Sequence, residues 1–457
     1  MSLIIPANSL AVGGYNIDNS LRFDDGSSDY LNRTPSSASN RKTWTFSTWF
    51  KRSNLGVRLV FLSGKDGSFP EGLNINTSNQ FEYDHDIAGT DYTLTSNMLF
   101  RDVSAWYNLV VTKDTTQATE TDRLKVWVNG TQITLNEVDL GYPPQNYDGA
   151  INKNVDHFIG NLSSTDTYYF DGYMAETYLI DGQALSPTDF GEFDQDTGIW
   201  KPIKYTGTYG TNGFYLDFEN SGSLGADQSG NGNNWTVNNL TSIDQTTDTP
   251  TNNFATGNPL VPTTLTYSDG NNTISHGADW KASPATIAVT QGKWYAEMKL
   301  VSTSFGATFG VEDMDLVSTW SAVLVGTSVN GRGYYSSDGT VYNNGSPSAF
   351  GATYTTGDII GIALDMDNKF VYFSKNGVYQ NSGVPTSGAS GTGGLSLAGT
   401  TYAFAYGMYN STSSLNFGNP PYTISSGNSD ANGYGNFEYS VPSGYYSLCT
   451  KNLAEFG

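Results

Sequence analysis

The chain of 457 residues contains a single cysteine, Cys449. An intrachain disulfide is therefore excluded, and the fold has to be stabilised by its hydrophobic core. Basic residues are also scarce, because 22 Lys and Arg stand against 44 Asp and Glu, for a net charge of −22. Binding to nucleic acid through its phosphates requires clustered cations, so we expect no nucleic-acid partner.

Long apolar runs are missing as well. No stretch is long enough to span a bilayer, so we expect no membrane insertion. Residues 1–7 have no basic segment and only a short apolar run, which argues against a signal peptide. A sustained 3.6-residue apolar period is also lacking, and charged residues make up only 14% of the chain. Long surface helices need more charge than this.

Aromatic residues and glycine are abundant, with 30 Tyr, 23 Phe, 9 Trp and 51 Gly. This mixture is typical of strands and turns. Residues 44–50 alternate in character, which places Trp44, Phe46 and Thr48 on one face of a strand. Further strands are expected at 106–112 and at 124–131, where Asn129-Gly130 supplies a turn. The pattern predicts an all-β fold of antiparallel sandwiches.

Residues 357–378 carry the most informative pattern. Ile359 to Leu364 is a mostly apolar run that we expect to be buried on both faces, 370–373 is an aromatic and β-branched strand, and Asn376-Gly377 predicts a tight turn. The string resembles the signature of SPRY domains, which implies a binding domain and not an enzyme. Further segments that resemble SPRY strands, in the same order, are 292–300, 309–312, 334–345 and 415–418.

An earlier part of the chain resembles laminin G-like jelly rolls of the concanavalin A-like superfamily. The segments that carry this resemblance are, in chain order, Leu21 to Gly26, Trp44 to Phe50, Trp106 to Thr112, Trp127 to Gly130, Phe170 to Glu176 and Ala184 to Ser186. The expected fold is therefore two antiparallel β-sandwiches, a concanavalin A-like jelly roll followed by a SPRY-like sandwich.

These resemblances divide the chain into five expected parts. They are an N-terminal docking segment (1–20), a laminin G-like jelly roll (21–205), an Asn/Thr/Gly-rich connector (206–260), a SPRY-like sandwich (261–446) and a C-terminal tail (447–457). The combination resembles large virion proteins of tailed bacteriophages of the marine type. It implies a tail fibre, tail appendage or head-decorating protein, located in the virion and assembled in the host cytoplasm.

The same resemblance implies several partners. Other virion proteins would hold the chain, and a host-surface glycan or receptor would be its ligand. Further copies of the chain are also expected, with a trimer favoured, because fibres gain avidity by presenting several weak sites together.

Two other functions stay open, a free carbohydrate-binding lectin and a jelly-roll glycan hydrolase. A hydrolase needs paired carboxylates on one strand. The nearest string, Glu192 to Asp196, follows the expected closing strand and ends in Asp. The three histidines lie far apart in sequence, and no nucleophile-elbow motif accompanies them. We therefore expect no enzymatic activity.

Two sets of residues are candidates for ligand binding. Trp320, Tyr334 and Tyr335 lie in expected loops or hairpins, and flat aromatic faces bind sugar rings. Asp227, Ser229 and Asn231 alternate as in the first half of a calcium loop, but Asn238 stands where the bidentate acid is expected. That departure favours an ordinary turn. We expect no cofactor, with Ca²⁺ at this loop as the alternative.

Overall fold

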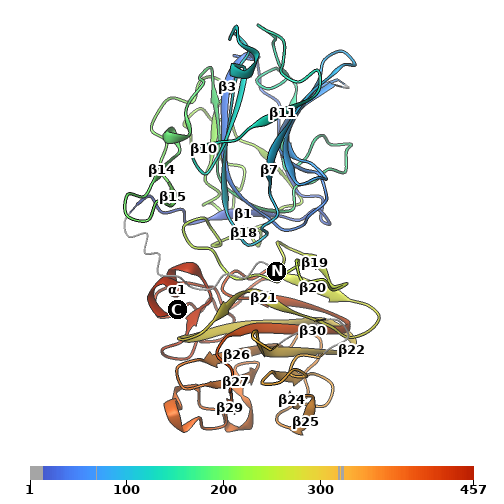
Figure 1. Ribbon diagram of the computed structural model, residues 1–457, viewed down its shortest axis with the longest axis vertical. Helices are drawn as coiled ribbons and strands as arrows, with labels where there is room; N and C mark the ends of the chain where they lie inside the picture. Colours follow the sequence, from blue (N-terminus) through green and yellow to red (C-terminus); the bar gives the residue numbers. More distant parts are fainter. Residues whose placement is uncertain (1–13, 68, 317–319, 321–323) are drawn as a thin grey trace. The chain divides into compact units, whose positions relative to one another are not determined.

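The computed structural model describes residues 14–67, 69–316, 320 and 324–457. These residues form two compact units that divide between Thr251 and Asn252. We call them the N-terminal unit (14–251) and the C-terminal unit (252–457); Figure 1 draws them in blue to green and in yellow to red. Within the described residues, no helix has both the length and the apolar character needed to cross a membrane.

The N-terminal unit consists of two large antiparallel sheets and a separate hairpin. In spatial order, the first sheet contains β10 (Thr131–Gln132), β9 (Leu124–Val128), β8 (Tyr107–Asp114), β3 (Thr43–Arg52), β13 (Gly172–Asp181), β1 (Ser20–Phe23) and β18 (Gln245–Thr246), and β16 (Phe214–Leu216) also pairs with β13. The second contains β11 (Leu135–Asp139), β7 (Asp91–Leu99), β6 (Gln80–Asp86), β5 (Phe69–Ile75), β4 (Leu59–Asp66), β12 (Asp156–Ile159), β2 (Tyr30–Arg33) and β17 (Thr236–Asn238). The remaining elements are the hairpin of β14 (Gly191–Phe193) and β15 (Trp200–Pro202) and the short 3₁₀ helices η1 (Glu120–Asp122) and η2 (Pro187–Asp189).

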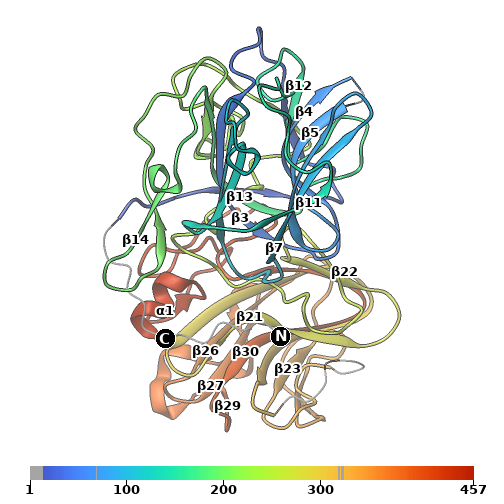
Figure 2. The same cartoon turned by 45° about the horizontal axis from the view of Figure 1, so that its top comes forward.

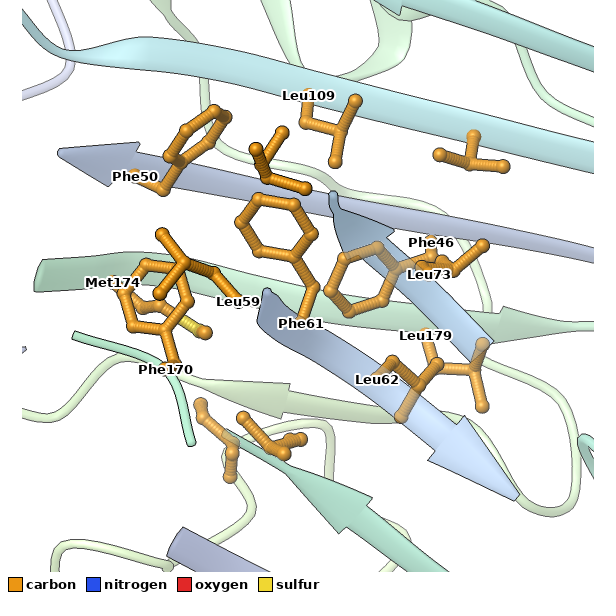
Figure 3. Packing of buried hydrophobic residues seen from close by; sticks show 14 of the residues in the cluster. Phe46, Phe50, Leu59, Phe61, Leu62, Leu73, Leu109, Phe170, Met174 and Leu179 are labelled. Atoms are coloured by element: carbon orange, nitrogen blue, oxygen red, sulfur yellow. The ribbon is translucent and has the colours of Figure 1, made fainter. Parts of the chain in front are cut away.

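The core of this unit lies between its two sheets. Figure 3 shows Phe46 and Phe50 from β3 meeting Phe61 from β4 in that space. The rings of Phe50 and Phe61 are 4.7 Å apart at their centroids and pack edge to face. Trp44 and Phe46 belong to this core, whereas Trp49 packs in a separate cluster, which confirms the alternation predicted for residues 44–50. The expected Asn129-Gly130 turn is also confirmed, with φ of 48° and 75°.

The expected connector (206–260) does not stand apart from the sandwiches. Its strands β16, β17 and β18 pair with β13, β2 and β1 and so extend both sheets of the N-terminal unit. Buried Asp248 accepts a hydrogen bond from the Lys51 ammonium at 2.6 Å, which ties this segment to β3. The segment also adds to the core of the N-terminal unit, because Phe214, Leu216 and Trp235 belong to it.

The two expected terminal segments also pack onto the units. Residues 1–13 of the docking segment (1–20) lie outside the described residues. Ile17 is buried, and its backbone N–H donates to the Thr251 hydroxyl at 3.1 Å. The tail (447–457) contains α1 (Thr450–Phe456), whose Leu453 belongs to the core of the C-terminal unit. The boundaries of the units therefore differ from those of the five expected parts.

The C-terminal unit is built on two long strands, β22 (Lys293–Asp313) and β30 (Tyr402–Asn416), which pair with each other along most of their length. Figure 2 shows β30 beside β21 (Lys281–Val289), its other long neighbour. The remaining strands are β19 (Thr266–Ser268), β20 (Thr273–His276), β23 (Arg332–Tyr335), β24 (Thr340–Asn343), β25 (Ser346–Ala349), β26 (Ile359–Asp365), β27 (Phe370–Lys375), β28 (Val378–Tyr379), β29 (Leu395–Ser396) and β31 (Tyr446–Ser447), with the 3₁₀ helices η3 (Gln380–Ser382) and η4 (Pro385–Ser390).

The signature segment 357–378 forms the hairpin of β26 and β27, as predicted. Every residue of β26 is buried, so the run is covered on both faces. Asp358 connects the two ends of the hairpin, because its carboxylate contacts the Lys375 ammonium at 3.1 Å and accepts from the Asn376 amide at 2.7 Å. The charged residues of this motif therefore close the hairpin, and its apolar residues fill the core.

Candidate ligand-binding site

Four hydroxyl side chains form a continuous row across one face of the C-terminal unit. Thr266 of β19 lies opposite Ser275 of β20, Ser275 lies opposite Thr412 of β30, and Thr412 lies opposite Ser302 of β22. Residues directly opposite in antiparallel strands share a face, so the four hydroxyls point the same way. We call them the hydroxyl row. The preceding residue of β20, Ile274, has the reverse orientation and is part of the core.

The hydroxyl row forms the floor of an open hollow of about 380 Å³. This volume is at the lower end of the roughly 300–1,000 Å³ found for small-molecule pockets. The other residues that line the hollow are His276, Gly277, Ser304, Asn410 and Ser411. The lining thus offers hydroxyl, amide and imidazole groups, and it contains no lysine, arginine or carboxylate.

Irregular pairing between β22 and β30 shapes the rim of this hollow. The register shifts between Leu300 and Ser302 and again between Thr303 and Gly306. Opposite the second shift, Asn410 has φ of 46°, in the left-handed region that asparagine tolerates better than most residues. Bulges re-aim side chains relative to a regular strand. The side chains of residues that are adjacent in sequence to the lining residues can therefore point to the same face of the sheet as the hollow.

Four aromatic rings gather at that rim, and we call them the aromatic cluster. Phe305 stacks on Tyr409 with their centroids 3.9 Å apart. The Trp280 ring meets Phe305 at 6.2 Å, Tyr335 at 5.6 Å and Tyr409 at 5.8 Å, each time edge to face. The Phe305 ring is 49% exposed, whereas many other phenylalanine rings of the chain are buried in a core. The cluster adjoins the hollow, because Phe305 follows Ser304 and Tyr409 precedes Asn410.

Both ring nitrogens of His276, which lines the hollow, lie beside oxygen atoms. Its Nε2 lies 2.7 Å from Asp279 Oδ1, and its Nδ1 lies 3.2 Å from the Thr264 carbonyl oxygen. Neither ring nitrogen is thus positioned to take a proton from one of the neighbouring serines. The Lys281 ammonium also contacts Asp279, at 2.6 Å, and these two partners lower the pKa of its carboxyl group. The His276 ring is therefore held in place beside the hollow and does not form a nucleophile–base pair with a serine.

One of the three predicted aromatic residues lies at this site, and two lie elsewhere. Tyr335 is half-buried and belongs to the aromatic cluster. Tyr334, the preceding residue on β23, has no exposed surface, because its ring faces the core and packs on Phe373. Trp320 is only 6% exposed and packs with Val325. The correction follows from packing, since both rings are used to fill the interior.

Sequence reasoning missed Trp280, Phe305 and Tyr409. A local signal does exist, because Phe305 directly follows the serine and threonine run 302–304, and Tyr409 is separated by one residue from the run 411–414. Such runs contribute little to a core. An aromatic residue beside one of them is therefore a candidate for exposure.

The predicted calcium loop is a hydrogen-bonded turn. One carboxylate oxygen of Asp227 accepts from the backbone N–H groups of Tyr215 and Ser229, at 3.0 and 2.9 Å. The other accepts from the Ser229 hydroxyl at 2.8 Å and from the Asn233 N–H at 2.7 Å. Asn231 donates its side-chain amide to the Gly210 and Gly213 carbonyls. These bonds match the turn that the sequence favoured.

A second acidic group has the geometry to hold a cation. Asp24, Asp25 and Asp171 each place a carboxylate oxygen within 4.8 Å of the others. Burial, and then the neighbouring Asp24 charge, raise the pKa of Asp25. Asp24 also accepts from the Ser27 N–H at 3.1 Å, as in an ordinary Asx turn.

The candidate hydrolase residues each contact a basic side chain. Glu192 lies on the short strand β14 with a side chain 56% exposed, and it contacts Lys201. Sequence reasoning overlooked a closer match, Glu82 and Asp84 on β6, which alternation places on one face. Both of these carboxylates contact Arg58. Glycoside hydrolysis instead needs two carboxyl groups in contrasting environments.

Family models match one segment in each unit of the chain. Residues 25–189 match the model of the concanavalin A-like lectin/glucanases superfamily, and residues 298–420 match the model of the SPRY domain. The two domain resemblances inferred from sequence motifs are thereby confirmed. A search of curated proteins found no match.

Solved structures show partial similarity. The SPRY domain of human HERC1 is 18% identical over 35% of this chain and 96% of its own, with a TM-score of 0.29. A proposed carbohydrate-binding protein from Bacteroides ovatus is 18% identical over 49% of this chain, with a TM-score of 0.31, and the match spans only 59% of that protein. A heptameric pentraxin from Limulus polyphemus is 13% identical over 38% of this chain and 80% of its own, with a TM-score of 0.27.

Proposed function

We propose that this protein is a non-catalytic recognition protein of a phage virion, where it serves as a tail fibre, tail appendage or head-decorating protein and attaches to a host-surface glycan or protein. Its two domains support the recognition role, because concanavalin A-like and SPRY sandwiches are binding modules. The virion location rests on the resemblance of the whole chain to phage proteins of this organisation.

The observation that carries the proposal is the exposed aromatic cluster beside the hydroxyl-lined hollow. A ring as exposed as Phe305 costs free energy in water unless a partner covers it. Rings placed beside hydroxyl and amide groups provide the combination that binds small polar molecules. The site thus gives the C-terminal unit a surface suited to recognition.

Several arrangements argue for binding without catalysis. Both ring nitrogens of His276 face acceptor oxygens, and Glu82 and Asp84 share Arg58 as their cationic partner. Glu192 contacts a lysine on a surface hairpin. The best candidates for a base or an acid pair are therefore engaged as structural groups.

We also propose that the protein assembles as a homotrimer. A homotrimer within the virion would present three copies of the site, and avidity of this kind can exceed single-site affinity by about 10²–10⁴-fold. A soluble lectin would use the same site, but it would be found free instead of in the particle.

The function is tested in two steps. Mass spectrometry and antibody-gold electron microscopy of purified virions should find the chain in the particle; its absence from particles would favour the soluble lectin. Purified protein should then bind host cells and release no reducing ends from host polysaccharide. Release that disappears in a Glu192→Gln or a Glu82→Gln variant would establish a hydrolase instead.

A further inference from the structure

We propose that the hydroxyl row and the aromatic cluster together form a binding site for a neutral saccharide. One face of a pyranose ring would cover Phe305, and the sugar's hydroxyl groups would bond to Ser302, Ser275, Thr412 and the Asn410 amide. The inference rests on the proposed recognition function and deepens it by naming the site and the chemical class of its ligand.

The apolar side of the site fits the C–H face of a sugar ring. Phe305 is 49% exposed, and Val301, which lies at the first register shift of the same strand, is 41% exposed. The stack on Tyr409 orients the Phe305 ring. A pyranose has one face of C–H groups and a periphery of hydroxyls. It can therefore cover the ring and still reach polar neighbours.

The polar side offers donors and acceptors at regular intervals. Neighbouring strands are about 4.8 Å apart, so adjacent members of the hydroxyl row are spaced by roughly that distance. Each hydroxyl can both donate and accept, as the hydroxyls of a sugar do. Asn410 adds an amide at the bulge, where φ of 46° turns it away from the regular strand path.

The charges of the residues around the hollow indicate whether its ligand is a neutral or an acidic sugar. The lining includes no lysine or arginine, the residues that bind carboxylate, phosphate or sulfate groups. The nearby Asp279 carboxylate is balanced by the Lys281 ammonium, which it contacts at 2.6 Å. The chain also carries a net charge of −22, which repels anions. A neutral saccharide is therefore favoured over an acidic one.

The protein side of the site is held in place before any ligand binds. The Ser337 hydroxyl donates to the Phe305 carbonyl at 2.7 Å. A Cβ on Gly306 would lie 2.7 Å from the Tyr335 ring, so glycine permits the close approach of these two strands. The Ser411 hydroxyl donates to the Gly306 carbonyl at 3.0 Å. Such preorganisation reduces the entropy lost on binding.

The test uses the full-length protein on an array of neutral and acidic oligosaccharides, followed by titration calorimetry with the best neutral binder. Phe305→Ala should weaken binding by at least about tenfold, and Phe305→Trp should preserve it, because stacking depends on the ring face. Thr412→Val, which replaces a hydroxyl by a methyl group, should weaken binding by roughly three- to tenfold. The matched controls are Phe193→Ala and Thr236→Val, which change exposed residues of the N-terminal unit and should leave binding unchanged.

Each result has a defined meaning once thermal unfolding shows that the variants are folded. Neutral-sugar binding that Phe305→Ala and Thr412→Val weaken supports the inference. Binding to neutral sugars that both variants retain would overturn the site assignment, and binding confined to acidic sugars would overturn the ligand class. If the protein binds host cells but no array sugar, this inference fails and the recognition function stands. If it neither binds host cells nor occurs in virions, the proposed function itself fails.

Discussion

Each of the two units buries a glutamate side chain, and the two glutamates have different partners. Glu71 of the N-terminal unit and Glu297 of the C-terminal unit both have no exposed surface. Glu71 faces the Lys113 ammonium and accepts from the backbone N–H groups of Ala150 and Ile151, at 2.6 and 2.9 Å. Glu297 accepts from the N–H groups of Glu438 and Tyr439, both at 2.8 Å, and from the Tyr295 hydroxyl at 3.1 Å.

The difference between these two glutamates is the counter-charge. Burial by itself would raise the pKa of Glu71, but Lys113, His85 and the Ile151 N–H outweigh it and hold that pKa at about 2. Burial dominates at Glu297 and raises its pKa to about 7, although its N–H donors oppose the rise. Backbone donors alone therefore do not offset burial, whereas a buried ammonium does.

Other buried groups follow this comparison in part, and Asp365 of the C-terminal unit departs from it, because it is fully buried and contacts the Lys293 ammonium at 3.0 Å. Glu312 of the C-terminal unit resembles Glu297, because burial raises its pKa to about 7. Two histidines of the N-terminal unit, His85 and His157, have pKa values lowered by burial to about 4. Glu176 is the exception in the N-terminal unit, since burial raises its pKa to about 7 despite bonds from three tyrosines. Mild acid should thus stabilise the C-terminal unit more than the N-terminal unit.

The largest expected effect comes from removing the counter-charge. Lys113→Met should lower the free energy of unfolding of the N-terminal unit by about 3–5 kcal/mol, because Glu71 is left buried without its cation. Differential scanning calorimetry should show the N-terminal transition moving to lower temperature. Lys125→Met is the matched control, since Lys125 is a partly exposed lysine on the neighbouring strand and should change stability by less than about 1 kcal/mol. A Lys113→Met variant as stable as that control would contradict the role assigned to the pair.

The second effect is the acid stabilisation of the C-terminal unit through Glu297. Its folded pKa of about 7 lies above the unfolded value of 4.5, so the folded form holds the proton more tightly. The resulting stability is complete below pH 4.5 and is lost as the pH rises through 7, by about 3 kcal/mol in total. Chemical unfolding between pH 4.5 and 8 measures it, and Glu297→Gln should reduce the slope without abolishing it, because Glu312 of the same unit also has a pKa raised to about 7. Glu455→Gln, an exposed change on α1, should leave the slope intact.

The third effect has the opposite sign and belongs to His157. The neutral ring fits its site, because Nε2 accepts from the Asn152 N–H at 3.0 Å while Nδ1–H donates to the Val155 carbonyl at 2.8 Å. Its folded pKa of about 4 is below the unfolded 6.5. The stability it contributes is complete above pH 6.5 and is lost as the pH falls toward 4, by about 2 kcal/mol at pH 5.

A variant separates His157 from the other titrating groups of the N-terminal unit. His85 acts in the same direction and Glu176 in the opposite one. Subtracting the pH profile of His157→Gln from that of the unchanged protein isolates the His157 contribution. His276→Gln, in the C-terminal unit, serves as the control. A difference profile that is level between pH 7 and 5 would show that burial of His157 is not linked to stability.

The smallest expected effect concerns the aromatic cluster. Phe305→Ala should change the stability of the C-terminal unit by less than about 1 kcal/mol, because half of the ring already faces water. Phe309→Ala on the same strand should cost about 3–5 kcal/mol, because that ring is fully buried. Equal losses in the two variants would mean that Phe305 is a packing residue instead of a binding surface.

Local patterns were sufficient to predict the strands and their turns. The alternation of Trp44 and Phe46 and the apolar run of 359–364 depend on which neighbours are apolar, and the Asn376-Gly377 turn depends on two adjacent residues. The alternation of Glu82 and Asp84 was equally visible in the sequence, although it was overlooked. Each of these features concerns residues close together in the chain.

The candidate site could not be predicted in the same way. The hydroxyl row joins residues 266, 275, 302 and 412, which meet only because four strands adopt one particular register. Two bulges between β22 and β30 then decide that Phe305 faces water. Tyr334 and Tyr335 are adjacent in sequence, yet one fills the core and the other joins the aromatic cluster.

The sequence by itself determined the all-β class and the absence of disulfides, because period-two alternation, turn residues and cysteine number are local or compositional properties. The two kinds of sandwich followed from the resemblance of its ordered motifs to known families. Only the tertiary structure decided that the connector's strands belong to the N-terminal unit, which buried acids have a counter-charge and which aromatic rings are exposed. The physical reason is that strand register and side-chain burial depend on long-range packing. A shift of one residue in register would turn the hydroxyl row into the core and the core outward.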